Sequence, residues 1–181
     1  MRKMLCAIMF GVGALFLCVA PVLALEGGRM TGGGSVFGFD QTGNRIRVTH
    51  GFELHCPSSP ESVPSIGPNS LEINWDGGNR FHLTTLSRVS CYSDLSSPAP
   101  PPGTAEMFDI YNGCGEGTYN GQPGYHACWI FTDHGEPGDN DTAEYYVEGG
   151  NPDLVVLNVP TTNLTFGNHQ VHRENKKSPT Q

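Results

Sequence analysis

No stretch of ten residues in this chain repeats apolar side chains at the 3.6-residue period of an amphipathic helix. Its 24 glycines and 14 prolines would interrupt most helices. Short runs rich in Val, Ile, Thr and aromatic residues lie between turn residues, at a spacing of about ten residues, which favours strands. The chain is therefore expected to be all-β, an antiparallel β-sandwich or open barrel with Gly/Pro-rich loops. The expected strands are Val36–Phe39, Arg45–Cys56, Leu71–Trp75, Arg80–Leu86, Tyr125–Asp133, Thr142–Val147 and Leu154–Val159.

One pair of neighbouring strands can be aligned from the sequence. Leu71–Trp75 alternates apolar and polar residues, as a strand with one buried face does. Asp76–Gly78 supplies a turn, and Phe81 and Leu83 continue the alternation beyond it. Pairing residue 73 with 81 and residue 71 with 83 places the apolar side chains on one face, so we expect a hairpin in this register.

The amino-terminal segment has the three parts of a secretory signal. Arg2 and Lys3 are followed by the uncharged apolar residues 4–19. The helix-breaking Pro21 then precedes a small-residue cleavage site formed by Val22 and Ala24. The alternative is a retained membrane anchor, which needs about 20 apolar residues to cross the hydrocarbon core. We expect a signal peptide that is cleaved after Ala24.

This segmentation predicts a signal peptide at residues 1–24, a single β domain at 25–172 and a disordered polar tail at 173–181. The expected location is secreted, extracellular or in the cell envelope or on the cell surface. Without Arg2 and Lys3, the basic residues fall from 10 to 8 against 18 acidic residues, a net charge of −10. Such a chain repels nucleic acid and anionic membranes. We therefore expect no nucleic-acid partner and no membrane insertion after signal removal.

Four cysteines lie beyond the predicted signal, and in an oxidising compartment they allow three disulfide connectivities. Cys114 and Cys128 are equidistant from Gly121 in a segment that reads as a hairpin with Asn120-Gly121 at its tip. Directly opposed residues are close enough to form a disulfide. We therefore expect Cys114–Cys128, which leaves Cys56–Cys91. A zinc site is the alternative, but the chain has no closely spaced cysteine pair of the kind that zinc sites use.

Several motifs along the chain resemble the post-COAP domain family of bacterial secreted and cell-surface proteins. The motifs are Arg29–Ser35, Val48–Cys56, Leu71–Leu83, Phe108–Tyr111, Gly113–Gly121, Phe131–Thr142 and Gly167–His172. The resemblance covers nearly all of residues 29–172, and it implies a compact β domain in an exported protein. It supplies no function, because the family has no established activity. Cys56 and Cys91 fall at cysteine positions of the family pattern, whereas Cys114 and Cys128 are additions.

An acidic segment between two expected strands is the strongest candidate for a metal site. Carboxylate and amide oxygens held by a glycine-containing loop are what Ca²⁺ prefers. The alternative is a plain connection, in which Pro137-Gly138 forms a type II turn and Asx side chains cap backbone amides. The spacing of an EF-hand is absent. The expected calcium ligands are Asp133, Glu136, Asp139, Asn140 and Asp141.

The histidines give a weaker metal signal. His50 and His55 are an odd number of residues apart, so on one strand they should face opposite sides, and the same holds for His169 and His172. A metal site could draw on His82 and His169 together. Packed or polar surface histidines are the alternative that we favour.

No catalytic motif is present, and Gly32–Gly34 reads as a turn at a strand entry, because no helix follows it. The expected function is a non-catalytic surface module that binds a glycan, a protein or an envelope component. Tyrosines would supply its contact area unless they belong to the core: Tyr119, Tyr125, Tyr145 and Tyr146. The alternative is a small secreted hydrolase that uses clustered carboxylates such as Glu116 and Glu136.

Overall fold

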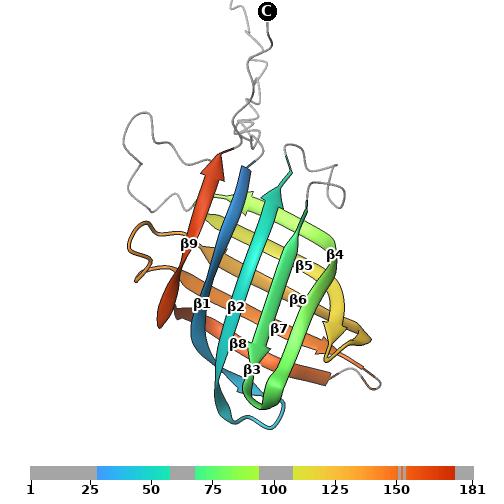
Figure 1. The fold of residues 1–181 in the computed structure, drawn as a ribbon. Helices are drawn as coiled ribbons and strands as arrows, with labels where there is room; N and C mark the ends of the chain where they lie inside the picture. Colours follow the sequence, from blue (N-terminus) through green and yellow to red (C-terminus); the bar gives the residue numbers. More distant parts are fainter. Residues whose placement is uncertain (1–27, 58–67, 94–107, 151, 153, 174–181) are drawn as a thin grey trace, which may run out of the picture.

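The computed structural model describes residues 28–57, 68–93, 108–150, 152 and 154–173 (Figure 1). The predicted signal peptide and residues 174–181 of the predicted tail lie outside the described residues. Strands dominate the described part, and a short 3₁₀ turn, η1 (Asp76–Gly78), links two of them. The strands are β1 (Gly28–Asp40), β2 (Arg45–Cys56), β3 (Ser70–Trp75), β4 (Asn79–Tyr92), β5 (Ile110–Tyr119), β6 (Gln122–Thr132), β7 (Thr142–Gly149), β8 (Leu154–Asn163) and β9 (Phe166–Arg173).

The strands form an antiparallel barrel of eight strands with one further strand outside it, which confirms the all-β prediction. Strands β1 to β8 pair in chain order. The sheet closes, rather than forming a sandwich or an open barrel, because the end of β1 also pairs with β8, with Phe39 opposite Asn158. In Figure 1, β1 to β4 lie on the near side and β5 to β8 cross behind them.

Strands β8 and β9 both pair with the same edge of β1. Residues 28–35 of β1 pair with β9, and only Phe39 and Asp40 pair with β8. The thirteen-residue strand β1 is therefore long enough to serve two partners on one side. The sequence prediction began this strand at Val36 and did not include β9. Both omissions fall on segments rich in glycine and polar residues, where the strand signal is weak.

Glycine residues allow β1 to approach its neighbours closely. A Cβ atom on Gly32 would lie 2.6 Å from the backbone oxygen of Asn168, and one on Gly34 would lie 2.7 Å from that of Phe166. Both contacts are with β9. The prediction that Gly32–Gly34 form a turn is therefore wrong, because these residues are extended and are glycine to let β9 pack against β1.

The inward-facing side chains fill the barrel, as expected for one with eight strands. Alternate residues are buried along the strands, most clearly in β7. The largest buried side chains are aromatic: Trp129, Tyr111, Tyr145, Phe81, Phe108 and Phe131. His50 and His169 are buried among them, at 5% and 0% exposure.

Two disulfides join the strands, with the connectivity that was predicted. Cys56 and Cys91 link the ends of β2 and β4, and each is 1% exposed. Cys114 and Cys128 are directly opposed in the β5–β6 ladder, with their Cα atoms 4.0 Å apart. Two disulfides are compatible with an extracellular location.

Candidate functional site

The outward side chains of four adjacent strands, β4 to β7, surround a groove of about 180 Å³. One row of directly paired residues crosses it as Arg88, Cys114, Cys128 and Tyr146. The next row contains Asn112, Ile130 and Glu144. We call this feature the outer groove. The outward residues that line it are Arg88, Asn112, Cys128, Ile130, Glu144 and Tyr146.

The outer groove brings unlike polar groups together. The Nη2 atom of Arg88 lies 3.1 Å from the Sγ atom of Cys114. The carboxylate of Glu144 accepts a hydrogen bond from the Thr161 hydroxyl. The site therefore presents a cation, a carboxylate, an amide and a phenol beside the apolar side chain of Ile130.

A further polar row borders the groove at Tyr146. His126 lies between Glu116 on β5 and Glu148 on β7. Its Nε2 atom is 2.9 Å from Oε1 of Glu148, and its ring is edge-on to that of Tyr146. These three residues thus extend the polar surface beside the outer groove across β5, β6 and β7.

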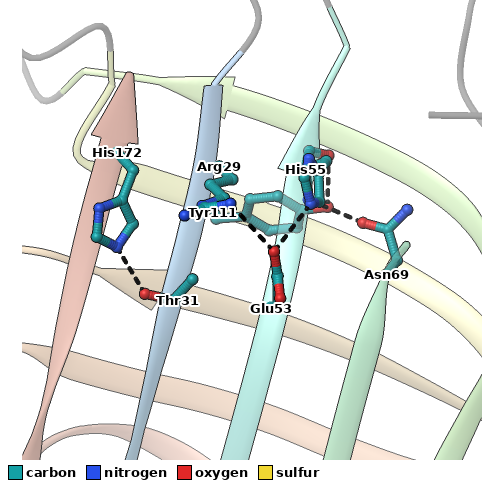
Figure 2. Close-up of polar contacts among 7 residues, drawn as sticks. All are labelled: Arg29, Thr31, Glu53, His55, Asn69, Tyr111 and His172. Atoms are coloured by element: carbon teal, nitrogen blue, oxygen red, sulfur yellow. Dashed lines mark hydrogen bonds and ion pairs between the residues drawn. The ribbon is translucent and has the colours of Figure 1, made fainter. Parts of the chain in front are cut away.

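A second group of polar contacts lies on another part of the barrel, across β9, β1 and β2 (Figure 2). Thr31 and His172 are joined by a hydrogen bond of 2.7 Å between Oγ1 and Nε2. The Oε1 atom of Glu53 lies 3.4 Å from Arg29 and 3.3 Å from His55. Because Arg29 and Glu53 are both about half exposed, the ion pair between them is weak.

The backbone beside His55 is fixed from two sides. Its amide donates to Oδ1 of Asn69, at 2.8 Å. Its carbonyl accepts from the buried Tyr111 hydroxyl, at 3.2 Å (Figure 2). This second group of polar contacts, on β9, β1 and β2, is therefore anchored to the core.

Inside the barrel, four residues from four strands form a hydrogen-bonded chain. The Thr132 carbonyl can only accept, so Nδ1 of His169 carries the proton of their 3.0 Å bond. Nε2 of His169 must then accept from Nε2 of His50, 2.9 Å away. Nδ1 of His50 in turn accepts from the Tyr145 hydroxyl, at 3.3 Å. This buried histidine chain fixes one tautomer for each histidine.

Burial keeps the histidine chain neutral. Desolvation, with a smaller contribution from neighbouring His169, lowers the pKa of His50 to about 3. Desolvation also lowers the pKa of His169 to about 4, although the Thr132 carbonyl and Asp133 favour its charged form. The pKa of Tyr145 is raised by burial. At neutral pH these groups therefore hold their positions as uncharged donors and acceptors.

The acidic segment predicted to bind calcium lies against the outer edge of β9. Asp141 accepts from the backbone amides of His134, at 2.8 Å, and His169, at 2.7 Å. Asp133 accepts from the amides of Gly135, at 2.9 Å, and Val171, at 2.7 Å. We call these two carboxylates the aspartate clasp. These bonds agree with the alternative interpretation of the segment, in which Asx side chains cap backbone amides.

The other three predicted calcium ligands do not take part in the aspartate clasp. Glu136 is exposed and accepts from the side-chain amide of Asn168, at 2.9 Å, while Asp139 and Asn140 are exposed. The turn differs from the predicted type II turn at Pro137-Gly138, because the Gly138 amide donates to the Gly135 carbonyl, one residue earlier. No group of three or more His, Cys, Asp or Glu side chains is arranged to hold a metal ion within the described ranges. Calcium binding stays a prediction.

The structure separates the other residue pairs that the sequence suggested. His82 is exposed on β4 beside Glu72, whereas His169 is buried in the barrel, so they cannot share a metal. Glu116 pairs with His126, and Glu136 follows the far end of β6. The six residue steps from 126 to 132 alone span about 20 Å, so the two glutamates are not clustered.

The four tyrosines divide between core and surface. Tyr145 belongs to the core at 1% exposure. Tyr119 stacks on Trp75 and, with Tyr125, packs against the core. Tyr146 is only partly buried and lines the outer groove. The groove residues Arg88, Asn112 and Glu144 were missed. Alternation alone would not have placed Arg88 on the outer face, because the register of β4 shifts between Leu86 and Arg88.

Comparisons with known proteins add nothing to this picture. No family model, curated protein or solved structure matches the chain. Among the residues that the structure describes, no helix is long and apolar enough to span a membrane. The resemblance to the post-COAP domain family therefore stays a prediction from the sequence motifs.

Proposed function

We propose that the protein is an exported, non-catalytic binding module whose outer groove recognises an oligosaccharide. The observation that carries this proposal is the composition of the groove. It combines an arginine, a glutamate, an asparagine and a tyrosine on one rigid four-stranded surface. Rigid strands hold such groups in place, so little conformational entropy is lost on binding.

The chemistry of these groups suits a sugar. Sugar hydroxyls both donate and accept, and they need carboxylate and amide oxygens together with N–H donors. Glu144, Asn112 and Arg88 offer these within two neighbouring rows of the sheet. Tyr146 and Ile130 offer apolar surface for the C–H face of a sugar ring. Small-molecule sites generally combine apolar walls with a few placed polar groups.

The barrel interior supports a surface site rather than an enclosed one. Aromatic side chains fill it, and the two buried histidines are hydrogen-bonded to each other, to the Thr132 carbonyl and to Tyr145. A ligand would have to displace fully buried side chains such as Trp129 and Tyr145 to enter. The outer groove is open without any such rearrangement.

Export is part of the same proposal. It is supported by the basic, apolar and small-residue parts of residues 1–24 and by the two disulfides. We expect N-terminal sequencing of the exported protein to begin at or near Leu25. Material that begins at Met1, or that stays in the membrane fraction, would contradict export.

Titration of the ¹⁵N-labelled protein with defined oligosaccharides tests the groove. The probes are soluble cello-, chito- and muropeptide oligomers, followed by amide chemical shifts. We expect shifts to concentrate at β4 to β7. Asn112→Ala and Glu144→Gln should each weaken binding about tenfold, because each removes a hydrogen bond worth about 1.4 kcal/mol.

Glu53→Gln is the matched control, because Glu53 is a partly exposed glutamate on the outer face of β2. It should leave the affinity unchanged. Chemical-shift changes that concentrate on β9, β1 and β2 would show that the sugar binds at the polar contacts of those strands instead. Binding that Glu53→Gln weakens and Glu144→Gln does not would show the same. No binding by any of the probes would remove the oligosaccharide proposal.

The row Glu116–His126–Glu148 is the observation that favours the second candidate, a small hydrolase. The two glutamates lie two strand spacings apart, about 10 Å between Cα atoms. Carboxyl groups separated by several ångströms can act as the acid and base of an inverting glycosidase. Hydrolysis of the same oligosaccharides, lost in Glu148→Gln, would favour this function over simple binding.

A further inference from the structure

We propose that Cys114–Cys128 is a thiol–disulfide exchange site for small thiols, whereas Cys56–Cys91 is a structural disulfide. The two differ in their surroundings. Cys56 and Cys91 are each 1% exposed in the core. Cys128 is half-buried and lines the outer groove, which is open to a small molecule.

The second observation is a cation placed on one of the two sulfurs. Arg88 pairs directly with Cys114 across the β4–β5 ladder, and its Nη2 atom lies 3.1 Å from Sγ of Cys114. A positive charge near a cysteine favours the thiolate and lowers the pKa of the thiol. Cys114 is therefore the better leaving group, and the more exposed Cys128 is the sulfur that an incoming thiolate can reach.

The steps of the exchange follow from this difference between the two sulfurs. A thiolate attacks Sγ of Cys128 and forms a mixed disulfide, and the Cys114–Cys128 bond breaks. Its electron pair leaves on Cys114, whose thiolate is then stabilised by Arg88. A second thiolate attacks the external sulfur of the mixed disulfide and releases the Cys128 thiolate. Two thiols are thus oxidised to one disulfide, and their two protons are taken up by Cys114 and Cys128.

The opposed position of the two cysteines makes the step reversible without a large rearrangement. Hydrogen-bonded pairing continues on both sides, at Gly113 with Trp129 and at Gly115 with Ala127. The ladder therefore holds the two thiols opposite each other after reduction, and they can re-form the bond. This activity is independent of the oligosaccharide proposal, because it needs only access to Cys128 and the charge of Arg88.

Differential alkylation of the native protein tests the proposal. The folded, two-disulfide protein is incubated with reduced glutathione at neutral pH, quenched in acid and alkylated, and each cysteine is quantified by mass spectrometry. We expect Cys114–Cys128 to open at least about tenfold faster than Cys56–Cys91. Equal rates would overturn the proposal, because they would show that both bonds open only when the protein unfolds.

Variants of Arg88 test the role of the cation. Arg88→Gln should slow the opening of Cys114–Cys128 and raise the pH at which reduced Cys114 reacts with iodoacetamide, while Arg88→Lys should largely restore both. Arg80→Gln is the control, because Arg80 is an exposed arginine on the same strand and pairs with Glu72. An unchanged rate and an unchanged pH profile in Arg88→Gln would show that the charge has no part in the exchange.

Discussion

At the scale of single residues, His50 and His169 are histidines that folding keeps uncharged. Each is enclosed by aromatic rings, with Phe52 and Phe131 stacked at 4.3 Å between centroids beside them. The titratable groups that face the pair are Tyr145 on β7, Asp133 after β6 and Asp141 before β7. Both Asp side chains bind backbone amides, so burial remains the dominant influence on the two histidines.

Their lowered pKa values predict a loss of stability in mild acid. The unfolded histidines titrate near pH 6.5, and the folded ones near 4 and 3. Their contribution is complete above about pH 6.5. It declines as the pH falls towards the pKa values of the folded histidines, because the unfolded state then binds protons that the native state does not bind. The free energy of unfolding should fall by up to about 1.4 kcal/mol per pH unit for each histidine.

Urea unfolding between pH 4 and pH 8 measures this slope. His50→Gln should flatten it, as should His169→Gln if the first variant does not fold. The exposed His82→Gln should leave the slope as in the parent protein. Equal slopes in the parent and in both core variants would show that other groups control the acid response.

At the scale of elements, the aspartate clasp does for β9 what a further strand would do. The amides of His169 and Val171 point away from β1 and would otherwise be an exposed strand edge. Asp141 and Asp133 accept from them, so side chains complete the ladder at this side of the molecule. Burial is the main reason that the pKa of Asp141 is raised, with Asp133 adding to it and the bonds from His169 and His134 opposing it.

Asp141→Asn should destabilise the protein by about 1–3 kcal/mol even in calcium-free buffer. The new amide nitrogen would face a backbone N–H donor and leave it unsatisfied. Asp139→Asn is the control, because Asp139 is exposed and should have little effect. Thermal unfolding with EDTA and with millimolar Ca²⁺ measures both. A rise of several degrees with Ca²⁺ that either variant abolishes would instead support the predicted calcium site.

At the scale of the whole molecule, the two disulfides constrain different lengths of chain. Cys56–Cys91 is 35 residues apart in sequence and joins strands that are not neighbours in the barrel. Cys114–Cys128 is 14 residues apart and joins strands that a hairpin already holds together. Closing the longer loop reduces the conformational entropy of the unfolded chain more, so Cys56–Cys91 should contribute more to stability than Cys114–Cys128.

Replacement of each cysteine pair by alanine tests this order. Loss of Cys56–Cys91 should lower the free energy of unfolding by about 3.8 kcal/mol and loss of Cys114–Cys128 by about 3 kcal/mol, on the chain-entropy estimate. The buried position of Cys56 and Cys91 should widen the gap. Urea unfolding of the two double variants gives the comparison. A larger loss for Cys114–Cys128 would mean that the short hairpin depends on its disulfide more than the barrel depends on the long one.

Local patterns in the sequence determined the strand class, one hairpin register and the disulfide connectivity. Ile73 lies opposite Phe81, as the alternation predicted, because that register buries every apolar side chain of the pair. Cys114 lies opposite Cys128, but by a different route from the one expected. Tyr119 pairs with Gln122 around the Asn120-Gly121 turn, and a bulge beside Thr118 then shifts the register by one residue. A symmetric count along the sequence cannot reveal such a bulge.

Only the tertiary structure decided how the sheet closes and what the polar residues do. His50 and His169 are 119 positions apart, and no local pattern indicates that β9 returns beside β1 to bring their rings together. The same return places Asp133 and Asp141, two of the predicted calcium ligands, against the backbone amides of β9. The outer groove also depends on four strands meeting side by side. Alternation assigns each side chain to a face, but pairing between distant strands determines which side chains share it.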